Sequence, residues 1–460
     1  MNGFKSGMVS LVAAVGLASL PFGAAAQSLT DALISAYNNS EELKAERAQL
    51  QSTNEGVRQA WAATMPSLAL SANATTSFRS ITTFGAANHT YTASVALVSE
   101  LTLWDGGATE LAIESAQVSV AAGRETLVDT EQQVLLAAVT AFMDMRRDAQ
   151  FLDLAENNFR VIARQLQAAQ DRFEVGEAQR TEVSRAEARL ADAQSIIALR
   201  QGGLEISRDV YYYAIGDYPG NLASPPPLPS IPRTLEAAKA IAVEKHPVVL
   251  RARQVVKIAE LNVARADAAM KPNVTLSAQI GANPNVSGDN YSISLGATMP
   301  LYRGGQLLSV RRQTMALKEK ALFDLQHAGQ LVSQNVTRFW AQYEISSASI
   351  TARQKEVRAS RVALRGIREE ANLGARTTLD VLDAERELLQ AETNLISARR
   401  DQYVAVYSLL SAMGLLTVRH LGLGIKTYDT NADYNRIWNP PTPTERSKQL
   451  DKIFKRAGRN

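Results

Sequence analysis

The 460-residue sequence contains no cysteine. This absence excludes disulfide bonds, thiolate catalysis, zinc-thiolate sites and a lipid-modified N-terminal cysteine. Histidine is nearly as scarce, with four residues at His89, His246, His327 and His420. They are scattered without metal-ligand spacing, so we expect no metal site, no cofactor and no histidine-based acid–base catalysis.

An excess of charge of one sign is also lacking. The chain has 49 basic and 46 acidic side chains and a net charge of +3. Such a balance argues against nucleic acid as a main partner. A local exception is the C-terminal end, which is proline-rich from Asn439 to Pro443 and then basic. We interpret residues 417–460 as a partly disordered surface tail.

Long apolar runs are confined to the N-terminus. Residues 1–26 carry Lys5, an apolar run over residues 9–20 and the sequence Ala24–Ala26 at their end. This is the layout of a secretory signal peptide with an A-x-A cleavage site, so we expect residues 1–26 to be removed. No later stretch approaches the roughly 20 apolar residues that a membrane helix needs. Membrane contact must therefore come from strands or surface helices.

The sequence contains an internal repeat. Residues 28–66 align without a gap with residues 234–272, at an offset of 272 − 66 = 206. Matching residues are Leu29/Leu235, Ala32/Ala238, Ala36/Ala242, Val57/Val263, Ala62/Ala268, Ala63/Ala269 and Pro66/Pro272, followed by Leu103–Gly107 with Leu301–Gly305 and Tyr213–Gly216 with Ser411–Gly414. We expect one unit used twice, over residues 27–216 and 234–416, with a proline-rich linker at 217–233. A duplicated unit favours a symmetric assembly over one asymmetric catalytic cleft.

Very long helical stretches lie between the repeat landmarks. From Ala108 to about Arg172 the chain is rich in alanine and charge, and apolar residues recur at helical spacing. The recurring residues are Val128, Leu135, Ala138, Phe142, Met145, Ala149 and Leu152, matched in the second half by Val332, Val336, Phe339, Tyr343 and Ile350. At 1.5 Å per residue this stretch would reach on the order of 100 Å. We predict a coiled-coil-like rod, with a helical bundle of ordinary size as the alternative.

After Pro66 and Pro272 the hydrophobic period changes from that of a helix to two. The alternation predicts four strands, at about residues 67–79, 91–104, 273–283 and 291–302. One face is polar and includes Arg79 and Glu100, which suit a watery lumen. The other face is apolar, with aromatic residues near the strand ends at Phe78, Tyr91, Trp104 and Tyr302.

These strands have the length that crosses a bilayer in a tilted barrel. Four strands cannot close a barrel, and lipid does not tolerate an open sheet edge. Several subunits would therefore share one barrel. A soluble antiparallel sheet packed on a helix is the alternative.

Two motifs between the long helices carry a resemblance to a known family. They are Asn372–Glu385, NLGARTTLDVLDAE, and Phe173–Val183, FEVGEAQRTEV. With these motifs and this order of elements, the chain resembles the TolC family of trimeric outer-membrane channel-tunnels over essentially the whole mature chain to about Leu416. Because it lacks cysteine, it resembles the non-lipidated branch.

The resemblance implies a mainly α fold with a β-barrel part. Three subunits would form a twelve-stranded barrel in outer-membrane lipid and a hollow helical barrel through the periplasm. The helix tips would meet a periplasmic adaptor, or membrane fusion, protein that links the duct to an inner-membrane ABC or proton-driven pump. Such a duct exports small toxic compounds, secreted proteins or both. The sequence has no G-x-x-x-x-G-K phosphate loop, so we predict a conduit rather than a motor.

The resemblance also assigns roles to residues at the tips. The adaptor-docking positions would be Val175, Gly176, Leu373 and Gly374. Asp380 and Asp383 resemble the acidic rings of a selectivity gate, and a spacing of three puts both on one helix face. For Asp380, a capping box with Thr377 is the alternative.

A latch is implied for Arg376, which would close the tip by bonding Thr181 or Glu182. The alternative is a solvated loop charge, which would stabilise the tip by no more than about 1 kcal/mol. The family usually has a tyrosine where this chain has Ala371, so a latch contact by that tyrosine is not expected here.

Two other classes of protein compete with the channel. A secreted structural or adhesive coiled coil would use the helices but would not need four amphipathic strands. An enzyme is not expected, because no acid–base pair or nucleophile motif stands out beyond the tip carboxylates.

Overall fold

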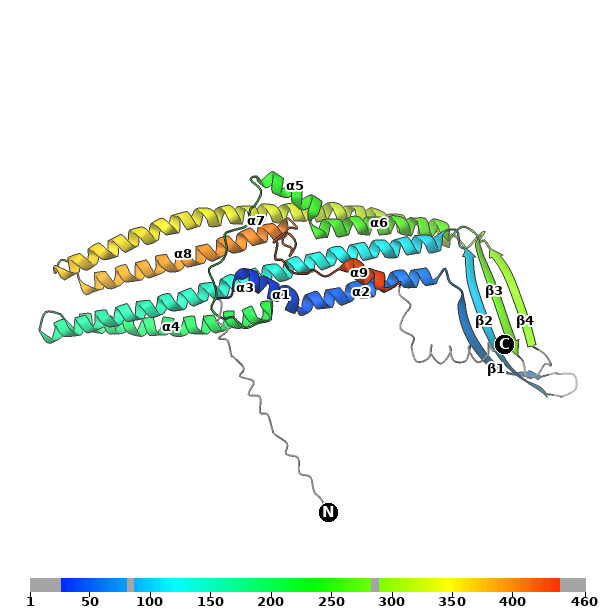
Figure 1. The fold of residues 1–460 in the computed structure, drawn as a ribbon, viewed down its shortest axis with the longest axis horizontal. Coiled ribbons are helices and arrows are strands. Elements are labelled where there is room, and N and C mark those ends of the chain that lie inside the picture. The colour runs from blue at the N-terminus through cyan, green and yellow to red at the C-terminus, as the bar shows by residue number, and fades with distance from the viewer. Residues whose placement is uncertain (1–25, 81–86, 283–288, 439–460) are drawn as a thin grey trace, which may run out of the picture.

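The chain folds into a long helical rod with a four-stranded sheet at one end (Figure 1). The computed structural model describes residues 26–80, 87–282 and 289–438. The expected signal peptide, except for Ala26, and the basic end of the tail lie outside the described residues. The mainly helical architecture with a small sheet confirms the predicted fold class.

Two helices of 67 residues each run the length of the rod, α3 (Ala108–Glu174) and α7 (Gln306–Asn372). The long helix predicted from Ala108 is confirmed. At 1.5 Å per residue each helix spans about 100 Å. Each begins after a glycine in the left-handed region, Gly107 with φ 91° and Gly305 with φ 82°. These glycines let the chain turn sharply from strand to helix.

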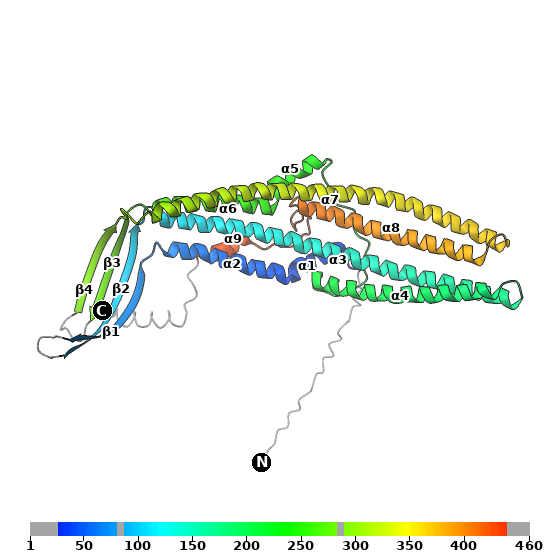
Figure 2. The ribbon, with the colours of Figure 1, turned by 180° about the vertical axis from the view of Figure 1, so that it is seen from behind.

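Shorter helices pair with the two long ones, as Figures 1 and 2 show. Along α3 lie α2 (Glu41–Ala62) and α4 (Arg180–Ile215); along α7 lie α6 (Pro247–Ala268) and α8 (Thr378–Ala412). Two further helices, α1 (Leu29–Asn39) and α5 (Leu235–Lys245), lie near mid-length. Each half is therefore one continuous helix with a second, interrupted line of helices beside it.

The interruptions fall at equivalent places in the two halves, and we call each of them a joint. In the first half Ser40 ends α1 and its Oγ accepts from the N–H of Leu43 to start α2, at 3.2 Å. In the second half Pro247 occupies the first position of α6, where its missing N–H costs nothing. The repeat aligns Ser40 with His246, the cap residue before Pro247, but it did not predict the breaks.

A glycine closes each joint. Gly216 and Gly414 end α4 and α8 with φ of 88° and 75°. A Cβ on Gly216 would lie 2.6 Å from the Cβ of Asn39, and one on Gly414 would lie 2.8 Å from the Cα of His246. No larger residue fits there, so the return helix of each hairpin stops against the end of its own half's short helix.

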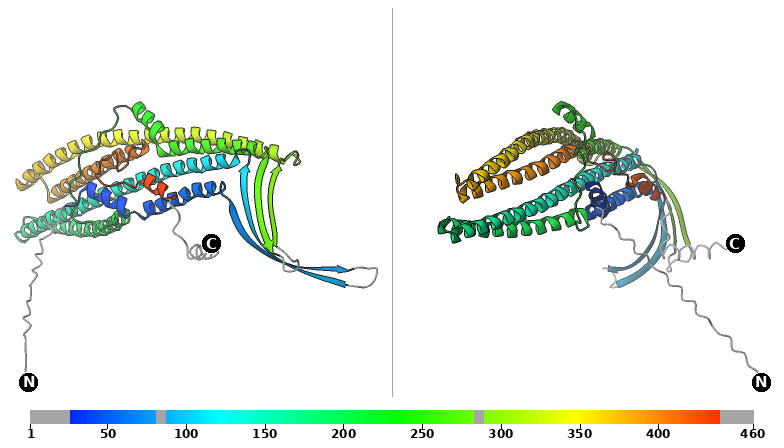
Figure 3. Two further views of the ribbon diagram at one scale, coloured as in Figure 1. Left: turned by 45° about the vertical axis from the view of Figure 1, so that its right-hand side comes forward. Right: turned by 60° about the vertical axis from the view of Figure 1, so that its left-hand side comes forward.

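The sheet has the order β1-β2-β3-β4, with every neighbouring pair antiparallel. The four predicted strands are present as β1 (Ser67–Ser80), β2 (Ala87–Trp104), β3 (Asn273–Ala282) and β4 (Asp289–Thr298). β4 ends before residue 302 because Pro300 has no N–H for the ladder. The sheet projects from the end of the rod, and no described helix packs along its faces (Figure 3). The alternative of a sheet packed on a helix is therefore wrong for the described residues.

The strand register sorts side chains by polarity. Leu70, Leu97, Ile280 and Tyr291 lie side by side across the four strands and are 73%, 37%, 52% and 70% exposed. We call this set the apolar row. On the opposite face, the register aligns Ser67, Glu100, Ser277 and Ser294. One face is thus apolar and open, while the other is polar.

The buried core lies at mid-length, where both halves and the C-terminal segment meet. It includes Phe142, Tyr211, Leu409 and Leu410, all almost fully buried. The last described helix, α9 (Thr430–Arg436), packs near α2, and the buried Asn54 donates to Asp433 Oδ2 at 3.2 Å. The described part of the predicted surface tail is therefore a packed segment rather than a loose extension.

Candidate functional site

The end of the rod opposite the sheet is formed by two helical hairpin tips (Figure 2). In the first tip, Gly176 has φ 81° and the N–H of Glu177 donates to the carbonyl of Arg172 at 2.8 Å. In the second, Gly374 has φ 78° and the N–H of Ala375 donates to the carbonyl of Glu370 at 2.9 Å. A glycine in the left-handed conformation satisfies the last carbonyls of each long helix. The two tips are therefore built by the same turn.

An exposed aliphatic side chain precedes each glycine. Val175 is 70% exposed and Leu373 is 85% exposed. Exposed apolar side chains can contribute to an interaction site when they belong to a larger patch. The structure thus brings all four predicted docking residues to one end of the molecule, and docking itself stays a prediction.

A three-residue network joins the two tips. The Nη2 of Arg172, on α3, donates to Thr378 Oγ1 on α8 at 2.7 Å, and the Thr378 hydroxyl donates to Glu182 Oε2 on α4 at 3.1 Å. Thr378 is buried between these helices. We call Arg172, Thr378 and Glu182 the tip network. A pocket of about 260 Å³ lies beside it, lined by residues of both tips including Arg185 and Leu382.

Sequence reasoning named Glu182 but missed Arg172 and Thr378. A signal was available in the repeat. Glu182 and Asp380 each stand six residues after the tip glycine. Asp380 is used by its own helix cap, whereas the cap residue of α4, Gln179, makes no capping bond with its side chain. Glu182 is therefore left to bond the other hairpin.

Within the chain, Arg376 bonds a different residue from Thr181 and Glu182, the partners predicted for it. Its Nε donates to Glu370 Oε2 at 2.8 Å, and both side chains are half exposed. This hydrogen bond raises the pKa of Arg376. The Thr181 hydroxyl donates to Gln179 Oε1 at 3.5 Å, and Glu182 belongs to the tip network. Arg376 therefore contacts the last turns of α7 in its own hairpin rather than the first tip, while a latch role stays a prediction.

Asp380 forms the capping box that was the alternative reading. Its N–H donates to Thr377 Oγ1 at 3.3 Å, and the N–H of Thr377 donates to Asp380 Oδ2 at 2.9 Å. The backbone bond from Thr377, followed by the side-chain bond, lowers the pKa of Asp380. The carboxylate is solvated and stays charged at neutral pH, so capping and a gate role are compatible.

Asp383 is tied to the neighbouring hairpin. Arg189 Nη2, on α4, donates to Asp383 Oδ1 at 3.0 Å, and the Asp383 side chain is about half exposed. This pairing offsets part of the negative charge that the gate hypothesis assigns to Asp383. The gate role of Asp380 and Asp383 stays a prediction.

Over residues 26–80, 87–282 and 289–438, no group of three or more His, Cys, Asp or Glu side chains could hold a metal ion. No described helix is both long and apolar enough to cross a membrane.

Comparison with known sequences gives consistent matches. A family model described as "Outer membrane efflux protein" matches residues 32–216 and 240–415, one segment in each half of the repeat. The outer membrane efflux protein BepC of Brucella suis biovar 1 (strain 1330) is 30% identical over 420 residues, covering 90% of this chain and 91% of BepC. The alkaline protease secretion protein AprF of Pseudomonas aeruginosa is 27% identical over 314 residues, covering 64% of this chain and 63% of AprF.

Solved structures share the fold. The crystal structure of the outer membrane protein VceC from Vibrio cholerae matches with a TM-score of 0.71 at 20% sequence identity. The match covers 84% of this chain and 96% of VceC. The rod, the sheet and their connection are therefore a known arrangement.

Proposed function

The chain belongs to the outer membrane efflux protein family, and we propose that three copies assemble into one duct whose shared barrel is closed by four strands from each copy. It is an outer-membrane protein with an export function. The apolar row carries the proposal of a shared barrel. Its four side chains lie on a sheet face that no described helix covers, and β1 and β4 are open edges in one chain. Lipid would cover the apolar face, and neighbouring copies would pair with the edges.

The proposed mode of action is that of a passive conduit. The family consists of efflux channels rather than enzymes, and we extend this to the absence of catalytic activity in this chain. Relatives are named for efflux and for secretion of an alkaline protease. We propose that this duct passes small toxic compounds, secreted proteins or both, with energy supplied by an inner-membrane pump. The rod would reach through the periplasm from the barrel.

Membrane assembly can be tested with adjacent residues on opposite faces of β4. Ile293 is 80% exposed and shares the face of the apolar row, whereas Ser294 belongs to the polar face. An arginine facing lipid near mid-bilayer costs about 2–4 kcal/mol. We expect Ile293→Arg to abolish most trimer recovered from outer membranes, and Ser294→Arg to be tolerated.

The measurement is the mass of the detergent-solubilised protein by light scattering, together with the yield from the membrane fraction. A wild-type chain that stays a water-soluble monomer without detergent would refute the shared barrel. Equal loss of trimer in both variants would refute the assignment of faces, because only Ile293 should meet lipid.

The tips are proposed to dock a periplasmic adaptor protein. Support comes from Val175 and Leu373, the exposed aliphatic residues beside Gly176 and Gly374. Two tips per chain in a trimer would present such residues repeatedly around one ring. Burying these exposed apolar side chains against a partner would remove apolar surface from water, which favours binding.

If the tips dock the adaptor, changing Val175 and Leu373 should impair adaptor binding but not trimer assembly. The double variant Val175→Asp, Leu373→Asp is expected to lose chemical cross-linking to the adaptor in intact cells, because aspartate cannot be buried in an apolar groove. Trimer yield should not change. The matched control Val175→Leu, Leu373→Val keeps both sites aliphatic and should cross-link normally. Undiminished cross-linking of the aspartate variant would place the docking surface elsewhere on the rod.

A further inference from the structure

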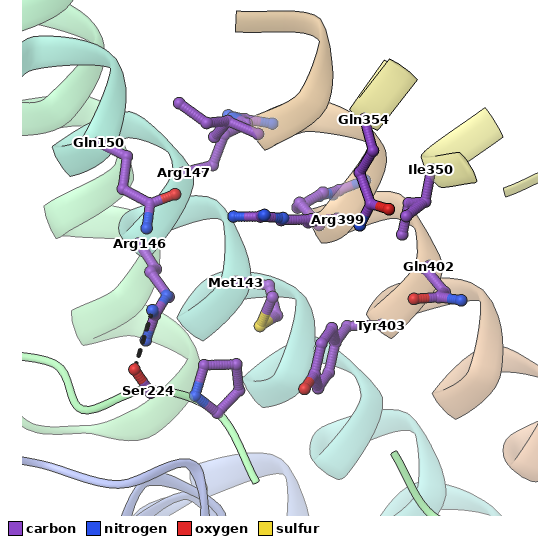
Figure 4. A pocket seen from close by; sticks show the side chains of 13 residues that line it. Met143, Arg146, Arg147, Gln150, Ser224, Ile350, Gln354, Arg399, Gln402 and Tyr403 are labelled. Carbon is purple, nitrogen blue, oxygen red and sulfur yellow. Dashed lines mark hydrogen bonds between the residues drawn. The ribbon is translucent and has the colours of Figure 1, made fainter. Parts of the chain in front are cut away.

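A pocket of about 350 Å³ lies at mid-length, away from the tips and the sheet. It is lined by residues of α3, α7, α8 and the linker at residues 217–233 (Figure 4). Its walls combine apolar side chains, such as Met143 and Ile350, with an unusual number of arginines. The four arginines are Arg146, Arg147, Arg399 and Arg400.

Two of these arginines are neutralised by carboxylates. Arg147 pairs with Asp144 and Asp148, both at 2.8 Å. Arg400 pairs with Asp144 at 2.7 Å and with Asp401 at 3.1 Å. These five residues form a network of three carboxylates and two guanidinium groups, with a formal net charge of 2 − 3 = −1. They leave little cationic character to the pocket.

The other two arginines have no such compensation. Arg146 donates to the carbonyl of Ala223 and, at 3.3 Å, to Ser224 Oγ, which are both neutral acceptors. Arg399 is exposed, and over the residues that the structure describes neither it nor Arg146 forms an ion pair. Figure 4 shows Arg399 directed into the pocket between α8 and α3.

The positive charges of Arg146 and Arg399 repel each other. Burial is the main cause that lowers the pKa of Arg146, and the charge of Arg399 lowers it further, against an opposing contribution from Tyr403. Like charges that converge beside apolar walls are unfavourable unless an anion lies between them. Planar, forked guanidinium groups are also well suited to bind the two oxygens of an oxyanion.

We propose that this pocket binds a small amphipathic organic anion. The oxyanion head would lie between Arg146 and Arg399, and the apolar body would pack against Met143, Ile350 and the ring of Tyr403. The volume suits a ligand of modest size, since ligand pockets begin at about 300 Å³. This site goes beyond the conduit function and does not rest on it.

The test uses the full-length protein in detergent and isothermal titration with 4-phenylbutyrate. Wild-type protein should bind this carboxylate, and Arg399→Gln should weaken the Kd by at least about tenfold, because a charge-assisted bond is lost. Arg399 forms no ion pair with any residue that the structure describes, so the variant should fold and keep its single-channel conductance. The matched control is Arg358→Gln. It removes an exposed arginine that lies on α7 outside the pocket, and this variant should bind 4-phenylbutyrate normally.

Two further probes separate the parts of the proposal. The neutral 4-phenylbutanamide should bind at least about tenfold more weakly than the carboxylate. Inorganic phosphate should also bind more weakly, because it has no apolar body to bury. Equal affinity of wild type and Arg399→Gln, or equal affinity for acid and amide, would overturn the site. Phosphate that binds as tightly as 4-phenylbutyrate would overturn the amphipathic character of the ligand.

Discussion

Replacing Arg172 with serine and Glu182 with alanine is expected to raise the conductance of the isolated channel several-fold. We propose that the tip network holds the periplasmic end closed, because it joins both hairpins through the buried Thr378. Each copy of the network would contribute about 1 kcal/mol or more. In a trimer three copies would act on one concerted opening, so the closed state would lose about 3 kcal/mol, on the order of 100-fold in the equilibrium.

Single-channel recording in planar bilayers measures this effect, with trimer yield as the check on folding. Arg376→Ser is the informative control. Within one chain it removes the exposed pair with Glu370 of α7, so conductance should stay at the closed level unless Arg376 bonds a neighbouring copy. If Arg376→Ser alone opens the channel, the latch implied by the family resemblance is supported, and it must act between copies. Unchanged conductance in the Arg172, Glu182 variant would mean that other contacts close the tip.

The second large effect concerns ion selectivity. We propose that Asp380 and Asp383 form an acidic gate, with six carboxylates around the axis of a trimer. Asp380→Asn with Asp383→Asn should reduce the preference for potassium over chloride several-fold. Asparagine still accepts the capping bond from Thr377, so helix α8 keeps its start. Loss of the Asp383 charge also leaves Arg189 unpaired, which shifts the selectivity further toward anions.

The matched control is Asp31→Asn, because Asp31 forms the same kind of capping box at the start of α1, far from the tips. Reversal potentials in a salt gradient give the selectivity. The bonds from Thr377 hold the pKa of Asp380 below its ordinary 3.8. Its charge is therefore present above that pH and is lost only as the pH falls through the lowered value. Selectivity that is the same in the double variant and the wild type would exclude the gate.

The architecture was largely predictable because its signals are local and repeated. Alternation after Pro66 and Pro272 identified the strands, and unbroken helical spacing from Ala108 identified the long helix. The breaks at Ser40 and Pro247 were not predicted, although a cap residue and a proline at the first helical position are local signals. Gly216 and Gly414 close these joints by tertiary contact, which periodicity does not register.

The positions of the two tips were predicted, but the hydrogen bonds between their side chains were not. Glycine in the turn and the capping box of Thr377 and Asp380 follow from short-range sequence rules. The tip network depends on three helices that meet after folding, so the bond from Arg172 to Thr378 spans 206 positions. Arg376 illustrates the same limit, because it bonds Glu370 of α7 in its own hairpin.

The joints give the hairpins a lever arm. Beyond Gly414 the paired helices continue for the 35 residues of α8, about 50 Å, to the tips. A tilt of about 5° about such an arm displaces its end by about 4 Å, enough to separate hydrogen-bonded partners. A slight tilt at mid-length would thus be magnified at the far end, while the sheet in the membrane stays still.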